Sequence, residues 1–162
     1  MNIGIIVFSQ TGHTLSVAEK IQATCTAAGH TAEIAQITIQ EQEKSDSPVV
    51  LRDVPDTTKY DLLLLGAPVQ AFSLCRAMVL YLKQVESLKG VPAGGFFTQG
   101  LPKLWMGGNR AWKQFRSHCL HRGADPVRLG HVHWKSEQRD EQIADIVTAA
   151  VKFVSTMAPK TP

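Results

Sequence analysis

The chain has 162 residues, of which 44% are hydrophobic and 19% are charged. This length fits one domain, and the composition is that of a globular protein with a hydrophobic core rather than a disordered or fibrous chain. The longest uninterrupted apolar stretch, residues 62–69, has eight residues, far fewer than the ~20 needed to cross a bilayer. We therefore expect a single domain over residues 1–158 with a frayed tail at 159–162, and no association with a membrane.

The three cysteines lie far apart in the sequence and form no C-x-x-C pair. An odd number of scattered cysteines is typical of a reducing compartment. The N-terminal residues also lack the basic start and small-residue cleavage site of a secretory signal. We expect a cytoplasmic protein in which Cys25, Cys75 and Cys119 are small buried hydrophobic residues on helices.

The net charge of +3 is unevenly distributed along the chain. Residues 1–59 carry four basic and seven acidic side chains, whereas residues 60–136 carry ten basic and three acidic ones. A basic run that faces only Asp125 as an acid comprises Lys103, Arg110, Lys113, Arg116, Arg122 and Arg128. This run is either a solvated helix face or a docking patch for an acidic partner or an anionic ligand. A nucleic-acid partner is not expected, because no aromatic-interleaved or helix-turn-helix pattern accompanies it.

Hydrophobic patterns predict alternating strands and helices along the chain. Continuous apolar runs indicate strands that are buried on both faces, as in a parallel sheet, and apolar spacings of three and four indicate helices. The predicted strands are residues 2–8, 31–37, 60–66, 91–98 and 125–134. The predicted helices are residues 14–28, a segment with Phe72, Cys75, Val79, Leu82 and Val85 on one face, residues 109–119 and residues 137–157.

Residues 38–59 are polar, charged and interrupted by two prolines, so either a short helix or a long surface loop fits them, with residues 49–51 buried. Five strands separated by helical segments predict an α/β, doubly wound parallel sheet with right-handed crossovers. Such sheets bind ligands beyond the carboxyl ends of their strands. The loops at residues 9–14, 68–72 and 98–110 are therefore the candidate binding loops.

The first of these loops directly follows the first predicted strand and reads Ser9-Gln10-Thr11-Gly12-His13-Thr14. Backbone N–H groups at a helix N-terminus, together with hydroxyl donors, can hold a phosphate without Lys or Arg. The glycine patterns typical of nucleoside triphosphate and dinucleotide sites are missing. A plain helix cap is the competing interpretation, and His13 is either a cation near the phosphate or a solvated loop residue.

At this point the sequence resembles the flavodoxin family. The likeness rests on Ser9-x-Thr11-Gly12-x-Thr14 after a hydrophobic strand, on the stretch from Tyr60 to Val69, and on Phe96-Phe97-Thr98-Gln99-Gly100. The resemblance implies a five-stranded sheet of order 2-1-3-4-5 and noncovalently bound FMN, with the phosphate on residues 9–14. It places the isoalloxazine ring between the second loop, Pro68-Val69-Gln70-Ala71-Phe72, and the third loop, which contains Thr98, Gln99, Gly100 and Trp105.

Phe72 and Trp105 are the large side chains that can stack on a flat ring in this cleft. Either can instead belong to the core or form a hydrophobic staple at the start of a helix. The three loops contain no Asp or Glu, and Lys103 and Arg110 lie in the third. Two unit charges ~8 Å apart interact by about 2 kcal/mol at a dielectric of ~20. We therefore predict a reduction potential less negative than that of a typical flavodoxin.

The chain departs from the family pattern in two further ways. Residues 67–71 lack the glycine that commonly permits a peptide flip beside the flavin, which puts stabilisation of the one-electron-reduced flavin in doubt. Residues 38–59 do not show the expected crossover helix.

The leading hypothesis for function is an FMN-dependent electron carrier whose basic region docks an acidic redox protein. The alternative is an FMN-dependent NAD(P)H oxidoreductase, in which residues 107–110 open space over the ring or receive a phosphate. A third hypothesis is a metal site, because His131 and His133 share a strand face and His118 and His121 lie one helical turn apart. No carboxylate or cysteine cluster completes that site, so we expect no metal.

Overall fold

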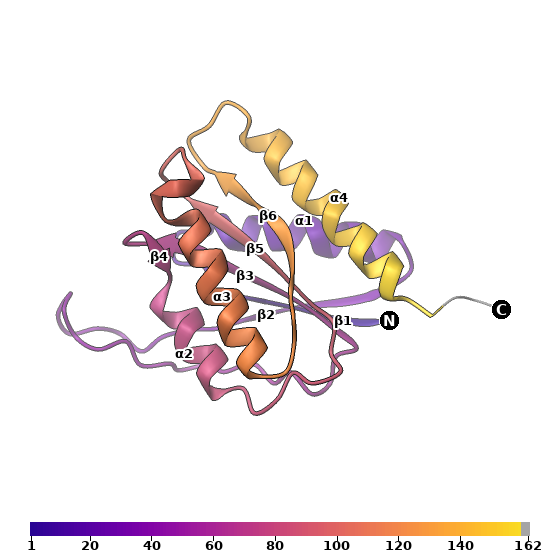
Figure 1. Cartoon of the computed structure of the whole chain (residues 1–162), viewed down its shortest axis with the longest axis horizontal. Coiled ribbons are helices and arrows are strands. Elements are labelled where there is room, and N and C mark those ends of the chain that lie inside the picture. Colours follow the sequence, from indigo (N-terminus) through magenta and orange to yellow (C-terminus); the bar gives the residue numbers. More distant parts are fainter. Residues whose placement is uncertain (160–162) are drawn as a thin grey trace.

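The computed structural model describes residues 1–159 and shows a sheet between two layers of helices (Figure 1). The strands are β1 (Asn2–Val7), β2 (Thr31–Gln36), β3 (Leu62–Gln70), β4 (Ser73–Leu74), β5 (Ala93–Gln99) and β6 (Val127–His133). The helices are α1 (His13–Ala27), α2 (Arg76–Gln84), α3 (Asn109–His121) and α4 (Arg139–Met157), and a kinked turn at Leu104–Gly108 precedes α3. Of the tail predicted at 159–162, all but Pro159 lies outside the described residues.

Five strands form a parallel sheet in the order β2-β1-β3-β5-β6, and the two-residue β4 pairs antiparallel with the end of β3. Without β4 in the count this is the predicted order 2-1-3-4-5, which is confirmed. The register aligns Ile5 of β1 with Ile34 of β2 and with Leu64 of β3, so apolar side chains lie next to one another across the sheet. The carboxyl ends of these strands point to the left in Figure 1.

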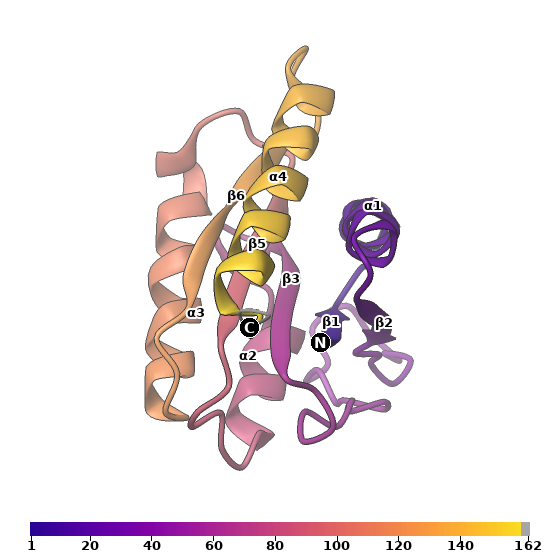
Figure 2. The same cartoon turned by 90° about the vertical axis from the view of Figure 1, so that its right-hand side faces the viewer.

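Helices cover both faces of the sheet. Helices α1 and α4 lie on one face, and α2 and α3 lie on the other (Figure 2). Each face buries its own hydrophobic cluster, because alternate residues of a strand point to opposite sides. In β1, for example, Ile5 packs toward α1 and α4, whereas Ile6 packs toward α2 and α3.

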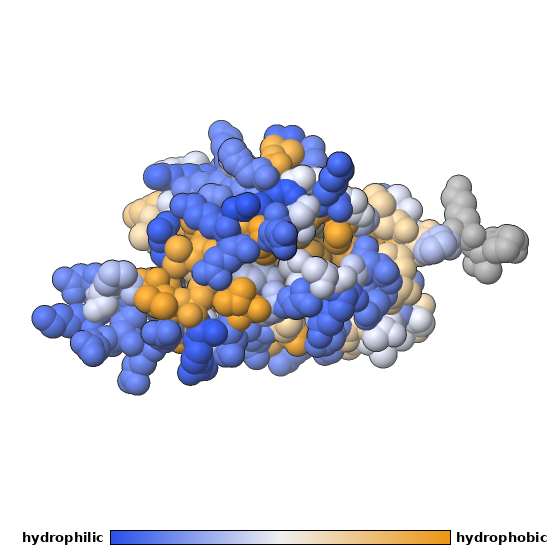
Figure 3. Space-filling view, turned by 90° about the horizontal axis from the view of Figure 1, so that it is seen from below, coloured by the Kyte–Doolittle hydropathy of each residue, from blue (hydrophilic) through white to orange (hydrophobic). Residues whose placement is uncertain are grey.

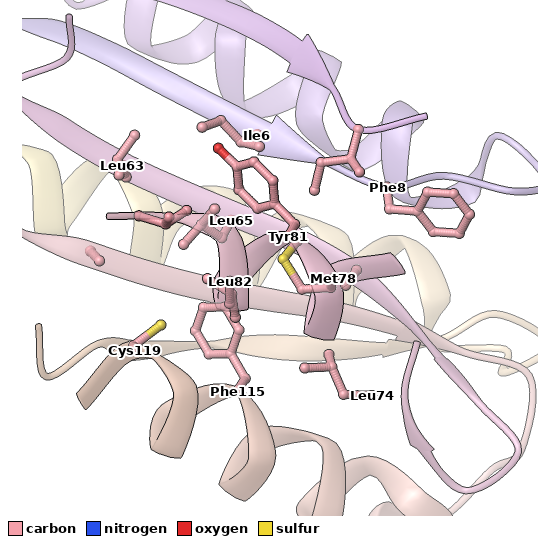
Figure 4. Close-up of a cluster of buried hydrophobic side chains, with 14 of the residues drawn as sticks. Ile6, Phe8, Leu63, Leu65, Leu74, Met78, Tyr81, Leu82, Phe115 and Cys119 are labelled. Atoms are coloured by element: carbon pink, nitrogen blue, oxygen red, sulfur yellow. The ribbon is translucent and has the colours of Figure 1, made fainter. Parts of the chain in front are cut away.

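The cluster on the α2 and α3 face contains Tyr81, the largest of the fully buried side chains among residues 1–159. Met78, Tyr81 and Leu82 of α2 lie against the sheet, and Phe115 and Cys119 come from α3 (Figure 4). Burial raises the pKa of the Cys119 thiol to about 12, so this thiol stays neutral near pH 7. All three cysteines are buried, as predicted, although Cys75 lies immediately before α2 rather than within it.

The connection between β2 and β3 contains no helix. Its two arms run antiparallel: the Gln40 amide donates to the Val50 carbonyl at 2.8 Å, and the Arg52 amide donates to the Thr38 carbonyl at 2.8 Å. The surface-loop alternative is thus the correct one. The connection projects as a hydrophilic extension at the left of Figure 3, with a group of hydrophobic side chains beside it. The expected burial of residues 49–51 holds only in part, because Leu51 packs on the core but Val50 is 48% exposed.

Two tyrosines fill the space over β1 that a crossover helix would cover. The Tyr60 ring lies against Gly4, where a Cβ atom would come within 2.4 Å of it. The Tyr81 hydroxyl donates to the Pro55 carbonyl at 2.6 Å, which ties the connection to α2. Burial raises the pKa of Tyr81, so its hydroxyl remains a donor.

The largest boundary error concerns the second predicted loop. Strand β3 was predicted to end at Gly66 but continues to Gln70, because β4 gives its last residues a partner. Helix α2 consequently begins only at Arg76, and Phe72 belongs to the hairpin turn rather than to the helix face on which we predicted it. Within residues 1–159, no helix is long and apolar enough to cross a membrane.

Candidate functional site

A cleft of about 210 Å³ lies at the carboxyl ends of β1, β3 and β5. All of its lining residues belong to the three loops that the sequence singled out. They are Gln10, Thr11, His13, Thr14, Pro68, Val69, Gln70, Thr98, Gln99 and Gly100. The structure therefore brings together ten of the fifteen predicted site residues, whereas Ser9, Gly12, Ala71, Phe72 and Trp105 lie outside the lining.

The first loop leads into α1 through Gly12, which has a left-handed φ of 87°. The Ser9 hydroxyl oxygen accepts the Leu15 amide at 3.1 Å, so Ser9 caps the helix. Among residues 1–159, the backbone N–H groups of residues 10–14 have no hydrogen-bond acceptor. Unpaired amides and the positive end of the helix dipole together attract an anion. The first turn of α1 contains no acidic residue that would occupy these amides.

A buried pair of hydroxyls joins the first loop to the third. Thr14 is 1% exposed and Thr98 is 3% exposed, and their hydroxyl oxygens lie 2.9 Å apart. Each hydroxyl can donate or accept, so the pair fixes α1 against β5 and keeps a hydroxyl group at the floor of the cleft.

His13 does not stand free beside the cleft, because it stacks on Trp134. The two ring centroids are 3.9 Å apart and the planes differ by 13°. The Arg139 guanidinium lies 5.3 Å from the centroid of the same indole ring. Trp134 was not predicted as a site residue from the sequence. The signal available was its position at the carboxyl end of the last predicted strand, at the same edge of the sheet as the three binding loops. The stack holds the His13 ring in one orientation at the start of α1.

The second loop is a two-residue hairpin turn between β3 and β4. Its central residues, Ala71 and Phe72, both have left-handed backbone conformations, with φ of 49° and 61°. Such turns normally use Asn or Gly, so the turn is strained. The Gln70 amide group donates to the Gln10 side-chain oxygen at 2.6 Å, which links the second loop to the first. The left-handed conformation in this loop thus occurs without the glycine that the family pattern contains.

The third loop folds back onto the second. Gly107 has a φ of 106°, and a Cβ atom there would lie 2.5 Å from the Phe72 backbone, so the tips of the two loops are in contact. The open space lies instead between the first loop and the base of each of the other two. Phe72 is 58% exposed and Trp105 is 75% exposed, so neither belongs to the core.

Gln99 organises the base of the third loop. Its side-chain amide donates to the Leu101 carbonyl at 2.8 Å and to the Lys103 carbonyl at 2.9 Å. Its side-chain oxygen is buried without a hydrogen-bond partner among residues 1–159. A buried polar atom without a partner is costly. This oxygen packs against Gly108, on the side of His131, and is closed off from the cleft.

His131 lies behind this loop and is held neutral. Its Nε2 accepts from the Arg128 guanidinium at 3.1 Å, and its ring stacks on Phe97 with 4.9 Å between the centroids. Burial, together with the charges of Arg128 and His133, lowers the pKa of His131 to about 3. The structure places no group of three or more potential metal-binding side chains within the described chain.

The predicted basic run divides into two groups. Arg116 pairs with Asp125 at 2.9 Å, Arg122 donates to the Leu82 and Lys83 carbonyls, and Arg128 donates to Asn109 and His131. Lys103, Arg110 and Lys113 are exposed and make no ion pair with residues 1–159. No carboxylate lines the cleft. The lining is therefore neutral to positive, which suits an anionic ligand.

Comparison with solved structures identifies the architecture. A flavodoxin from Streptococcus pneumoniae matches with a TM-score of 0.72 and 15% identity over 96% of this chain and 99% of that one. Flavodoxin 2 from Bacillus cereus matches with a TM-score of 0.69 and 17% identity over 96% and 99%. A Fusobacterium nucleatum flavodoxin bound to flavin mononucleotide matches with a TM-score of 0.63 and 12% identity over 96% and 98%.

The chain has the flavodoxin fold. Neither a protein-family model nor a curated protein sequence matches it. The fold agrees with the resemblance based on the three motifs, and the carboxyl-terminal parts of all three motifs lie at the carboxyl edge of the sheet. The helix-free connection from β2 to β3 and the acid-free loops are features of this chain within that fold.

Proposed function

We propose that this protein binds FMN noncovalently and acts as an electron carrier between redox partners. The observation that carries the proposal is the cluster of backbone amides without acceptors at residues 10–14, beside the Thr14 and Thr98 hydroxyls. A phosphate monoester is a compact dianion that such donors bind without Lys or Arg. The Fusobacterium nucleatum neighbour of the same fold binds this cofactor.

The residues at the cleft fit the rest of the cofactor as well. The base of the second loop contributes Pro68 and Val69, which offer apolar surface. When bound, the flavin would supply the one- and two-electron chemistry, and the protein would supply binding, orientation and electrostatics. Lys103 and Arg110 would favour added negative charge on the reduced cofactor.

The packing of the third loop favours a carrier over an NAD(P)H oxidoreductase. Gly107 is buried against the Phe72 backbone, and Gly108 is buried against the Gln99 side chain and His131. The two glycines therefore serve close packing and do not open space for a nicotinamide over the cleft.

A fluorescence titration of FMN with the purified protein tests binding, since stacking and burial quench flavin emission. We expect saturable 1:1 quenching and a visible spectrum that shifts on binding. Mixing the FMN-loaded protein with NADPH or NADH alone then separates the two activities. Slow or no bleaching is expected for a carrier, and rapid bleaching at catalytic rates would contradict that part of the proposal. A redox titration of the same complex tests the predicted, less negative potential.

A further inference from the structure

A second hollow lies between α2 and α3, beneath the β3–β4 hairpin. It has a volume of about 530 Å³. Three basic side chains line it: Arg76 and Lys83 from α2, and His118 from α3. No carboxylate is among its lining residues. We call this hollow the basic groove.

The charges of the basic groove are not used within the fold. The Arg76 and Lys83 side chains are exposed and make neither an ion pair nor a hydrogen bond with the rest of residues 1–159. Arg122, by contrast, donates to the last carbonyls of α2 at 3.1 and 2.6 Å and so stabilises the helix end. Only the first two are thus available to a partner.

The surroundings of His118 show that no acid balances these charges. Burial lowers the pKa of His118, and the positive charges of Lys83, His121, Arg122 and Arg76 lower it further. No acidic group contributes to the shift. The positive surface therefore extends along both helices.

The basic groove adjoins the candidate cofactor cleft. Gln70 lines both hollows, so only the β3–β4 hairpin separates them. The hairpin carries the exposed Phe72, and the neighbouring third loop carries the exposed Trp105. Exposed aromatic side chains beside a charged rim are typical of protein interfaces.

We propose that the basic groove is the docking site for an acidic redox protein, which inserts a carboxylate-rich segment between α2 and α3. The inference rests on the proposed function. Charge complementarity supports this occupant, because the positive side chains are spread along two helices rather than gathered around one phosphate. A segment docked there would bring the partner's redox centre to the hairpin side of the cofactor cleft. Such contacts are weak, fast and sensitive to salt.

The test uses the full FMN-loaded chain and a ten-residue polyglutamate peptide as the probe, with NADPH and duplex DNA as comparison ligands. Binding is followed by calorimetry at low salt and by NMR of the backbone amides and the His118 ring. The double variant Arg76→Glu/Lys83→Glu is compared with Lys20→Glu/Lys152→Glu. The latter pair matches the charge change on exposed residues of α1 and α4, across the sheet.

We expect the peptide to shift α2 and α3 resonances and to raise the pKa of His118, because a carboxylate nearby favours its protonated form. The groove variant should weaken peptide binding at least tenfold, and the control variant less than twofold. The proposal would be overturned if the two variants lost peptide affinity equally, or if the resonance shifts were spread over the whole surface. It would also be overturned if NADPH or DNA bound in the groove and the peptide did not. The groove variant should bind FMN as tightly as the parent. A failure of docking is therefore seen only in the peptide titration, and a failure of cofactor binding is seen in the FMN titration.

Discussion

The two ends of the sheet carry hollows of opposite chemical character. At the carboxyl end, a cleft of about 210 Å³ presents amides without acceptors and no carboxylate. At the amino end, a hollow of about 430 Å³ is lined by residues 54–58, Tyr81 and residues 84–87, which include Asp56 and Glu86. The Asp56 carboxylate already accepts the Thr58 amide and hydroxyl at 2.9 Å, and these hydrogen bonds lower the pKa of Asp56.

The binding end of the sheet is thus marked by backbone amides without hydrogen-bond acceptors and not by the volume of its hollow. In the larger hollow the Asp56 carboxylate and the Tyr81 hydroxyl are paired within the fold, whereas the smaller one keeps backbone donors that have no acceptor among residues 1–159. Changes at the amino end should therefore alter stability and leave FMN affinity intact, and changes at the carboxyl end should do the reverse.

The largest expected effect is on stability at the amino end. Tyr60→Ala removes a ring that is 5% exposed and leaves a cavity over Gly4. Such truncations cost about 3–5 kcal/mol of unfolding free energy. Urea denaturation measures the loss, and Tyr60→Phe, which keeps the ring, is the control and should remain within about 1 kcal/mol of the parent. A Tyr60→Ala protein that is fully stable, or that is folded but cannot bind FMN, would break the division between the two ends.

A second effect concerns acid stability. Because His131 has a folded pKa of about 3 and an unfolded value near 6.5, the unfolded chain takes up this proton first as the pH falls. The stabilising contribution is complete above pH 6.5 and is lost progressively from there toward pH 3, by about 3 kcal/mol at pH 4. Urea denaturation between pH 7 and pH 4 should show this decline in the parent and a shallower one in His131→Gln. Parallel profiles would show that His131 titrates normally.

A third change should affect binding and stability in opposite directions. Thr11→Asp places a carboxylate among the free amides at the start of α1, where it repels a phosphate but interacts favourably with the helix dipole. FMN affinity should fall about 100-fold, or about 2.7 kcal/mol, without loss of thermal stability.

The matched control is Thr26→Asp, an exposed residue at the other end of the same helix. It should leave FMN binding unchanged and lower stability by about 0.3–1 kcal/mol, because a carboxylate there faces the negative end of the dipole. If both variants bind FMN equally well, the anion site does not lie on the first loop.

These contrasts also show which parts of the molecule are predictable from sequence. The five parallel strands follow from continuous apolar runs such as Leu62–Leu65, and the first loop follows from a contiguous motif behind such a run. The remainder depends on contacts between distant residues. The extension of β3 beyond Gly66 pairs Ala67 and Pro68 with Phe97 and Thr98 of β5. The His13–Trp134 stack joins residues from opposite ends of the chain, and Tyr60 fills the place of a helix whose absence no local pattern predicts.

The smallest expected effect tests the stack that sequence reasoning missed. Trp134→Ala removes the ring that orients His13 beside the free amides. An aromatic contact of this kind contributes about 0.5–1.5 kcal/mol, so FMN affinity should fall by a factor of about two to ten, and Trp134→Phe should restore most of it. An unchanged dissociation constant in the alanine variant would show that His13 needs no support.

The central claim is that the backbone amides of residues 10–14 bind the phosphate group of FMN. Parallel calorimetric titrations of the unmodified protein with FMN and with riboflavin test it most directly, because the two ligands differ only in that phosphate. The account predicts that FMN binds at least 100-fold more tightly, and that the difference shrinks to less than tenfold in Thr11→Asp. Equal affinity for the two ligands would contradict it.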